Sequence, residues 1–418
     1  MKKTLSVAAF GAATVLAASV VPTNDAQAIP SFARQVGMGC LACHFQTFPA
    51  LNAFGRAFKM NAFTDGGGPI EDVEDEHLNI PGALNASFVV RANYTVGSNA
   101  AAGNENGGIE IPVDTVLLLG GRIGAHTGTF IEFDGTAANW QLLNSIDFGA
   151  VKGGVNFFNT GFGPTAGIET SNVFGQHAGS LAGGDVSPTN TLTKKAYGGN
   201  EQGVAFWAGN NDFIAQLALI APGEAVDNIG TKLGNAGTVG KGAGLFNLAT
   251  LVRVFATPQI GDLDVGVGFG VISGKAHKDA KVPMDAMWVD AQVQTEVSGM
   301  QVGVYGDYAS VKGKTNTGAS LVGGTLNNPF GTSGTGLADG DKQSGFGFRA
   351  TAKVMPAIIV GAGYMSMKSD IAGATTTDTT THLAVTWEIY QNMELNVVYN
   401  AYNNGNGNTT LLDLEALM

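Results

Sequence analysis

The residues of this chain with the most distinctive chemistry stand together near its N-terminus, in the run Cys40-Leu41-Ala42-Cys43-His44. The run contains both cysteines of the protein. Two cysteines separated by two residues and followed by histidine form the attachment motif of a c-type haem. The thiols would form thioether bonds with haem vinyl groups, and His44 would be the proximal ligand of the iron. We therefore predict one covalent haem c, with a pair of buried or metal-binding thiols as the alternative.

The sequence leaves several possibilities for the distal ligand of this haem. Met60 lies sixteen residues after His44, and its thioether could bind the iron from the distal side. His77 is the other candidate, and an open or water-ligated iron is a third possibility. An equally good interpretation of Met60 is an ordinary apolar residue at the end of a helix.

Residues 29–63 are predicted to form a monohaem cytochrome c head of two short helices, the second covering Phe48–Met60. Pro49 would stand in its first turn, where proline is tolerated. Arg56 and Lys59 would project from another face of this helix than its apolar residues. They could contact the haem propionates, or could form a solvated basic face. Residues at helical spacing would form an apolar face against the haem plane: Phe48, Leu51, Phe54 and Phe58.

The segment before the head, residues 1–28, has the features of a signal peptide. Lys2 and Lys3 are followed by an apolar run, and Ala26-Gln27-Ala28 is a small-x-small cleavage site. Export agrees with the haem motif, because c-type haem is attached outside the cytoplasm.

Residues 64–82 are predicted to be an acidic, Gly-rich linker. Its run from Glu71 to His77 is interpreted as a solvated tether, or as a patch that collects cations, since carboxylates and imidazole can bind divalent metals. The whole chain has a formal net charge of −12. This charge attracts cations and excludes nucleic acid as a partner.

From residue 83 to residue 418 apolar and polar residues alternate, which is the period of a β-strand. Phe346 and Phe348, for example, share one face, and Arg349 and Thr351 share the other. The 61 glycines and the 13% of charged residues suit an outer-membrane barrel with a lipid-facing side and a wet lumen. We predict an all-β fold, a transmembrane antiparallel β-barrel of about 16 strands with the α-helical haem head as its plug. A soluble sandwich is the alternative.

The remaining histidines do not form a catalytic or metal-binding pattern. His126, His177, His277 and His382 lack the spacing of paired ligands, and the sequence has no Ser-His-Asp pattern, phosphate loop or HExxH helix. We predict that these histidines are ordinary loop or rim residues and that none of the residues is catalytic.

Further motifs accompany the haem run in the head: Pro30-Ser31-Phe32-Ala33-Arg34-Gln35, Phe48-Pro49 and Phe54-Gly55-Arg56-Ala57-Phe58-Lys59. In these motifs the head resembles the fused outer-membrane cytochrome–porins, best known as iron-oxidising cytochromes. The resemblance implies a haem domain that plugs a porin-like barrel and passes electrons from an extracellular donor, for which Fe(II) is one candidate, to periplasmic carriers such as soluble cytochromes. Fe(II) oxidation would then be its enzymatic activity. The chain departs from the family at Ala62-Phe63, where Gly-Tyr is usual, and at Met60, where Leu is frequent.

Three functions follow as hypotheses. The first is an electron conduit, because a hydrocarbon layer of about 30 Å blocks electron flow unless a redox centre lies within it. The second is a porin-like transport barrel in which the haem staples a plug or acts as a redox gate. The third is a haem or metal binder without electron traffic. All three place the protein in the outer membrane, in contact with the lipid bilayer.

Overall fold

The computed structural model describes residues 30–66, 72–75, 78–81, 85–97, 107–133, 138–160, 164–165, 167–174, 186–193, 201–222, 248–276, 281–319, 324–332, 336–390, 392–403 and 407–418. The predicted signal peptide lies outside the described residues, as do His77, His177 and His277.

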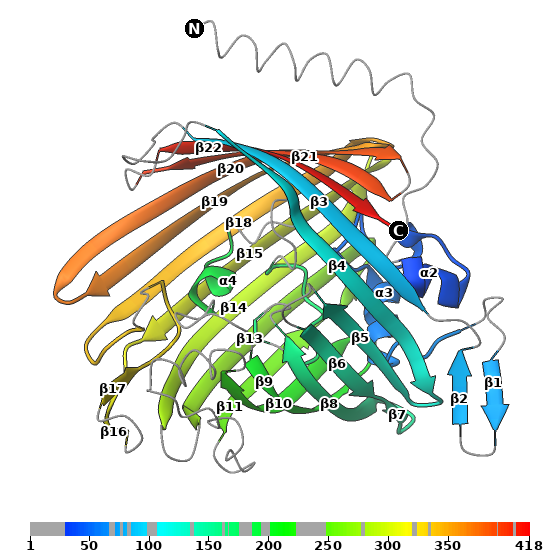
Figure 1. Ribbon diagram of the computed structural model, residues 1–418, viewed down its shortest axis with the longest axis horizontal. Coiled ribbons are helices and arrows are strands. Elements are labelled where there is room, and N and C mark those ends of the chain that lie inside the picture. Colours follow the sequence, from blue (N-terminus) through cyan, green and yellow to red (C-terminus); the bar gives the residue numbers. More distant parts are fainter. Residues whose placement is uncertain are drawn as a thin grey trace, which may run out of the picture.

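A closed ring of antiparallel strands makes up most of the described chain (Figure 1). In ring order the segments are β3 (Ala86–Gly97), β4 (Gly108–Gly124), β5 (Thr127–Phe133), β6 (Ala138–Asn144), β7 (Ile146–Asp147), β8 (Lys152–Thr160), β9 (Glu201–Gly209), β10 (Phe213–Pro222), β11 (Ala249–Ala256), β12 (Gln259–Ile260), β13 (Leu263–Ala276), β14 (Val282–Val297), β15 (Met300–Lys312), β18 (Lys342–Met355), β19 (Ile358–Ile371), β20 (Ala374–Tyr390), β21 (Met393–Tyr402) and β22 (Asn408–Leu417). β6 and β7 both pair with β8, and β11 and β12 both pair with β13. The eighteen segments described therefore form sixteen strands, and pairing of β22 with β3 closes the barrel. The predicted fold is confirmed.

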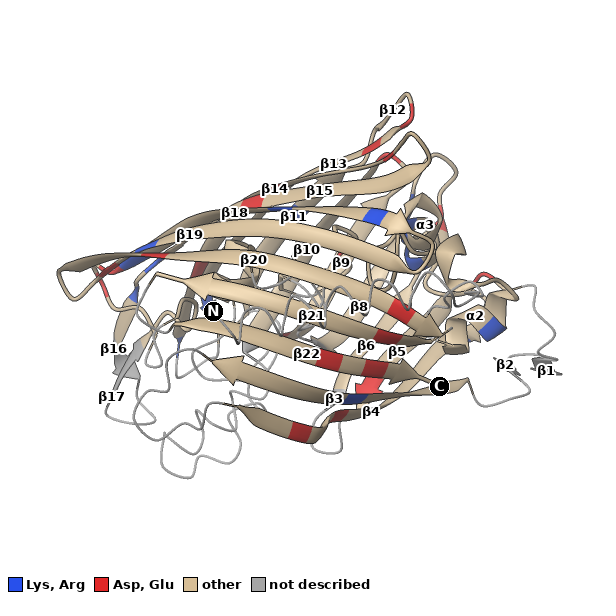
Figure 2. Ribbon diagram, turned by 90° about the horizontal axis from the view of Figure 1, so that it is seen from above, with Lys and Arg blue, Asp and Glu red and all other residues tan. Residues whose placement is uncertain are grey.

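Side chains alternate between the two faces of the wall as the sequence pattern predicts. On β18, Phe346 and Phe348 are about half exposed, whereas Arg349 and Thr351 point into the lumen and are buried. Figure 2 shows that Lys, Arg, Asp and Glu are sparse along the strands. An apolar outer face and a polar inner face are what a barrel in a bilayer requires, because no water is available to solvate charge on the lipid side.

The two ends of the barrel differ in their connections. Short turns join strands at one end, as at Pro356–Ala357 and Ser298–Gly299, and the C-terminus lies there too. The opposite end has the long connections. Two of them contain secondary structure that the sequence pattern did not predict: helix α4 (Pro188–Thr193), and a hairpin of β16 (Thr315–Ala319) and β17 (Gly324–Asn327). Short turns are periplasmic in outer-membrane barrels, so this rule orients the molecule.

The N-terminal head lies at the short-turn end (Figure 1). It consists of helix α2 (Pro30–Val36), the 3-10 turn η1 (Cys40–Ala42) and helix α3 (Ala53–Met60). A two-stranded hairpin, β1 (Asp72–Asp75) with β2 (Leu78–Pro81), occupies part of the predicted linker. In the described part of the chain, no helix combines the length and apolar character needed to cross a membrane.

The predicted start of the second helix was wrong. Helix α3 begins at Ala53, because the Asn52 side chain accepts a hydrogen bond from the Gly55 N–H at 2.9 Å and caps the helix there. The predicted apolar stripe therefore does not form one helical face. Phe54 is 42% exposed, while Phe58 is buried and packs edge-on against Phe32, with 5.3 Å between ring centroids.

The lipid-facing side of β18 gives a direct test of the fold. We expect Phe348→Lys to destabilise the barrel folded in lipid vesicles by about 2 to 4 kcal/mol, because it places a charge near the bilayer midplane. Thr376→Lys, on an exposed position near the outer end of β20, should cost only about 0 to 1 kcal/mol. Urea titration of the vesicle-bound barrel measures both, and equal costs would contradict the assigned lipid face.

Candidate functional site

Both cysteines lie on one tight turn of the head. Cys40 is 2% exposed and Cys43 is 9% exposed, and neither forms a disulfide. The N–H groups of Cys43 and His44 both donate to the carbonyl of Cys40, at 3.0 and 2.9 Å. These bonds wind residues 40–44 into a single turn, which we call the attachment turn. Burial raises the pKa of both thiols. Burial thus favours the protonated form of both thiols as long as nothing is bound to them.

The imidazole of His44 is held in a defined tautomer. Its Nδ1 lies 3.2 Å from the carbonyl oxygen of Ala50, and since a carbonyl can only accept, Nδ1 carries the hydrogen. Burial lowers the pKa of His44 to about 4, against the opposing effect of the Ala50 and Pro49 carbonyls. The ring is thus neutral at physiological pH and presents Nε2 as its basic nitrogen. Iron-binding histidines are usually oriented in this way, by a backbone carbonyl on the other ring nitrogen.

Asn52 organises the attachment turn and was missed by the sequence analysis. Besides capping α3, its side-chain amide donates to the carbonyls of Leu41 at 3.2 Å and Ala42 at 3.0 Å. Its backbone N–H donates to Cys43 O at 2.9 Å. An Asn three residues before a helical Gly55 is a capping signal that could have been recognised. Its contacts with the motif depend on how the chain folds back.

Gly55 allows helix α3 to pack directly on the attachment turn. A Cβ atom at this position would lie 2.1 Å from Cys43 O and 3.0 Å from the Leu51 side chain. A residue with a side chain would therefore force the helix and the turn apart.

The head fills the mouth of the barrel and is bonded to strands on all sides of it. Hydrogen bonds join residues of the head to seven strands around the ring. The pairs are Ser31–Ser87 (β3), Gln35–Arg122 (β4), Asn61–Lys152 (β8), Arg56–Asp264 (β13), Gln46–Gln301 (β15), Gln46–Thr351 (β18) and Thr47–Glu394 (β21). The head is therefore a plug at the short-turn end.

Arg56 and Lys59, for which we predict possible propionate contacts, both bind groups of the barrel. Arg56 donates two hydrogen bonds to the Asp264 carboxylate, at 2.7 and 2.8 Å. Lys59 donates to the carbonyl of Glu169 at 2.6 Å, and burial lowers its pKa to about 8. Both cations anchor the head to the barrel, a role that depends on residues far away in the sequence.

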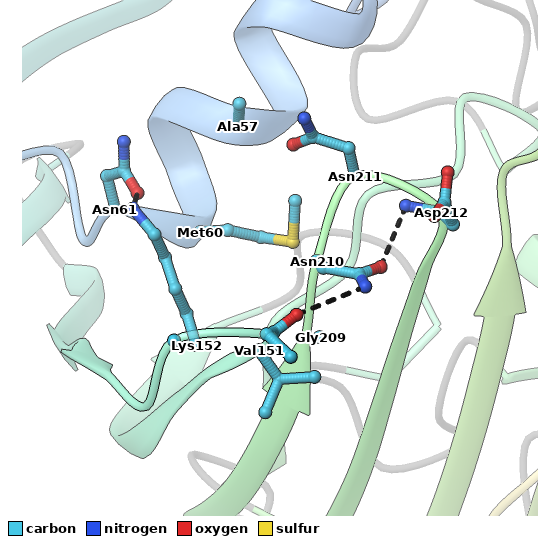
Figure 3. Close-up of a pocket in the computed structure, with 11 residues that line it drawn as sticks. Ala57, Met60, Asn61, Val151, Lys152, Gly209, Asn210, Asn211 and Asp212 are labelled. Atoms are coloured by element: carbon cyan, nitrogen blue, oxygen red, sulfur yellow. Dashed lines mark hydrogen bonds between the residues drawn. The ribbon is translucent and has the colours of Figure 1, made fainter.

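Met60 is turned away from the attachment turn. It is 6% exposed and belongs to an apolar cluster with Phe58, Trp207 and Phe255. At about 100° per residue, Met60 lies about 140° around α3 from Gly55, the residue that touches Cys43. Figure 3 shows its side chain between α3 and the turns that precede β8 and β10. There it lines a pocket of about 390 Å³. The structure thus does not bring Met60 and His44 together.

An inner segment, residues 167–174 of the β8–β9 connection, runs between the head and the lumenal wall. Its Glu169 accepts hydrogen bonds from Arg253 at 2.9 and 3.2 Å, and Arg253 also donates to Asp290 at 2.6 and 3.0 Å. All three charged groups are buried. Gly268 provides the space, because a Cβ there would lie 2.1 Å from the Arg253 guanidinium.

Carboxylates line the lumenal wall beside the head. Glu388 faces Glu394 across β20 and β21, and Glu394 faces Glu415 across β21 and β22, so three buried glutamates share one level of the barrel. Figure 2 shows acidic residues of these strands toward the end that carries α2. His382 is also on this wall, buried and 2.8 Å from Asn400 Oδ1, so its prediction as a loop or rim residue was wrong. His126 does lie in an exposed turn.

The donor groups of the attachment turn fit a c-type haem. Two unpaired thiols are three residues apart on one turn, and the following imidazole is neutral with Nδ1 occupied by a carbonyl. These are the groups needed for two thioethers and one axial bond. No described residue is assigned as the distal ligand, and the predicted candidate His77 lies outside the described residues.

Solved outer-membrane proteins are similar to this chain at low sequence identity. No family model and no curated protein sequence matches the chain. Among solved structures, it is similar to OmpT of Vibrio cholerae, at 12% identity and a TM-score of 0.48, over 83% of this chain and 100% of that one. It is also similar to the channel DcaP of Acinetobacter baumannii, at 11% identity and a TM-score of 0.44, over 82% of this chain and 99% of the other.

The class of the protein follows from its own strand pairing. The chain forms a closed, sixteen-stranded, porin-like barrel of the outer membrane within its described residues, and its mouth is filled by an N-terminal helical head. The lipid bilayer is therefore its environment.

The packing of α3 on the attachment turn can be tested with two glycines. We expect Gly55→Ala to destabilise the head by about 1 to 3 kcal/mol, because the added methyl group overlaps Cys43 O. Gly39→Ala is the control, since a Cβ at Gly39 would have no atom within 4 Å. Pulse proteolysis of the head measures both, and equal stability of the two variants would contradict the close packing.

The orientation of Met60 leads to a second prediction. Met60→Ala should weaken docking of the head by about 2 to 5 kcal/mol, as for other buried methionines. It should leave the haem absorption spectrum of the loaded protein unchanged. Met38→Ala, on a 47% exposed side chain, should change stability by no more than about 0.5 kcal/mol. Loss of a sulfur-to-iron band in Met60→Ala would show that Met60 is a ligand after all.

Proposed function

We propose that this protein is an outer-membrane electron-transfer protein that carries one c-type haem in the periplasmic mouth of its barrel. Cys40 and Cys43 would hold the haem covalently, and His44 would bind its iron. The observation that carries the proposal is the position of the attachment motif. It lies within a plug that is bonded to seven strands around the mouth, with the imidazole already neutral and oriented. A haem bound there would supply one-electron exchange between ferric and ferrous iron.

Residues of the head shape the site, and residues of the barrel hold the head in place. Asn52 and Gly55 shape the attachment turn, and the Ala50 carbonyl orients the His44 ring. Arg56, bound to Asp264, holds the head against the wall. Because the barrel closes around these groups, water is excluded from the buried side of the motif.

The position of the head favours periplasmic carriers on one side and a small donor on the other. Soluble electron carriers, for example cytochromes, could approach the head directly from the periplasm. β18 has fourteen residues, and a strand of that length spans about 35 Å along the barrel axis at the usual tilt. An extracellular donor would therefore have to enter the lumen, which suits a small cation such as Fe(II). The lumenal carboxylates beside the head would attract it.

The resemblance of the head to the fused cytochrome–porins supports the same proposal. On this basis we infer membership of that family, with oxidation of an extracellular reductant as the activity. The structure adds an anchoring role for Arg56 and Lys59 in the matching motif.

A transport barrel is the second candidate, and the barrel by itself supports it more directly than it supports electron transfer. A sixteen-stranded wall can enclose an aqueous channel, and its lumenal face carries charged and amide side chains. In this case the head would be a plug whose release opens the channel, and a haem would act as a staple or redox gate.

Reconstituted liposomes separate the two candidates. With Fe(II) outside and a ferric cytochrome enclosed, the haem-loaded protein should reduce the enclosed acceptor, whereas Cys43→Ala should not. The variant also controls for Fe(II) that passes through an open channel. Resistance of the folded barrel to detergent without heating would show that the variant has inserted.

Failure of the loaded protein to reduce the enclosed acceptor would contradict electron conduction. Large and steady ionic currents from the loaded protein in a planar bilayer would favour the transport barrel instead. A parent protein without a c-type spectrum would remove the basis for both haem roles.

A further inference from the structure

We propose that Asn172, on the inner segment of the barrel, is a positioning residue for the axial ligand His44. This inference rests on the proposed function, because it concerns how a haem ligand is oriented. It assigns part of that task to the barrel, more than 100 residues away from the haem motif in the sequence.

The carboxamide of Asn172 binds both peptide groups of one head residue. Its Oδ1 accepts a hydrogen bond from the Leu51 N–H at 2.7 Å, and its Nδ2 donates to the Leu51 carbonyl at 2.8 Å. Asn172 is 9% exposed. This two-point contact imitates the pairing of a neighbouring strand, and it fixes both the position and the rotation of the Leu51 backbone.

Leu51 is in turn paired with the haem ligand. His44 and Leu51 form an antiparallel bridge, flanked by hydrogen bonds from Asn52 N–H to Cys43 O at 2.9 Å and from Phe45 N–H to Ala50 O at 2.8 Å. The same Ala50 carbonyl accepts from the His44 ring. A displacement of Leu51 would therefore move both the backbone of His44 and the carbonyl that orients its imidazole.

The lumenal wall holds Asn172 itself in place. Its backbone N–H donates to Gln292 Oε1 at 2.8 Å, and Arg349 donates to the carbonyls of Asn172 at 2.5 Å and Val173 at 2.7 Å. The Arg349 guanidinium lies 4.3 Å from the centre of the Tyr305 ring. Strands β14, β15 and β18 thus hold Asn172 in place. We call its two hydrogen bonds to Leu51 the clamp, and the contacts run from the wall through Asn172 and Leu51 to His44.

The test compares Asn172→Ala with Asn172→Asp in the full-length protein. Asn172→Ala removes both hydrogen bonds to Leu51, whereas Asn172→Asp keeps an acceptor for the Leu51 N–H and loses the donor. Hydrogen exchange at the Leu51 amide should be about tenfold faster in Asn172→Ala, the effect of losing one hydrogen bond. In the electron paramagnetic resonance spectrum of the ferric haem, the signals of Asn172→Ala should be broader or have shifted g values. These g values report the orientation of the imidazole plane. In Asn172→Asp the retained acceptor should keep exchange at the Leu51 amide slower than in Asn172→Ala, while the new carboxylate oxygen, which faces the Leu51 carbonyl, should still change the haem spectrum.

The matched control is Asn190→Ala on α4. Asn190 belongs to the same connection, and its described hydrogen bond, to Ser187 Oγ, comes from its backbone N–H. Asn190→Ala should leave hydrogen exchange at Leu51 and the haem spectrum unchanged. Unchanged exchange at Leu51 in Asn172→Ala would overturn the clamp. Faster exchange with an unchanged haem spectrum would overturn the positioning role while leaving the proposed function intact. A parent protein without haem would overturn the proposed function, and this inference with it.

Discussion

Closure of the backbone hydrogen-bond ladder is the constraint on which the rest of this structure depends. Within a bilayer an unpaired peptide group costs several kcal/mol, so a sheet can span only if its first and last strands pair. β22 and β3 make that pairing, and the Phe88 and Met418 backbones extend it at 2.8 and 2.9 Å. An even number of antiparallel strands returns the chain to the side from which it entered. The head, which precedes β3, is therefore brought to the same mouth as the C-terminus.

The interior of the barrel depends on a second balance, between buried charge and its partners. Arg253, Glu169 and Asp290 are withdrawn from water, and each would be costly alone. Together they satisfy one another, and Gly268 provides the room that the guanidinium needs. This network holds the inner segment in place, and the inner segment in turn contacts the head. The position of the attachment motif is thus set by the polar lumen as well as by the helices around it.

The sequence analysis succeeded where the decisive interactions are local or periodic. The alternation around Arg349 predicted which residues of β18 face lipid, because side chains of a strand alternate strictly. The cysteines and His44 form a recognisable motif, because attachment of a haem would require this fixed spacing. The second helix was placed too early, at Phe48, because its apolar residues looked periodic. The capping bond from Asn52, together with the hydrogen bonds that fold residues 43–45 back onto 50–52, starts the helix at Ala53 instead.

Composition and period together determined the class of fold and its membrane environment, and the motif singled out Cys40, Cys43 and His44 as the predicted haem ligands. Only the tertiary structure decided the partners of the other side chains. Arg56 meets Asp264 across 208 positions of sequence, and Leu51 meets Asn172 across 121. These pairings exist because barrel closure brings distant strand ends to one mouth. The spacing of residues along the sequence cannot predict such contacts, because each contact depends on the register and number of all the strands between the two residues.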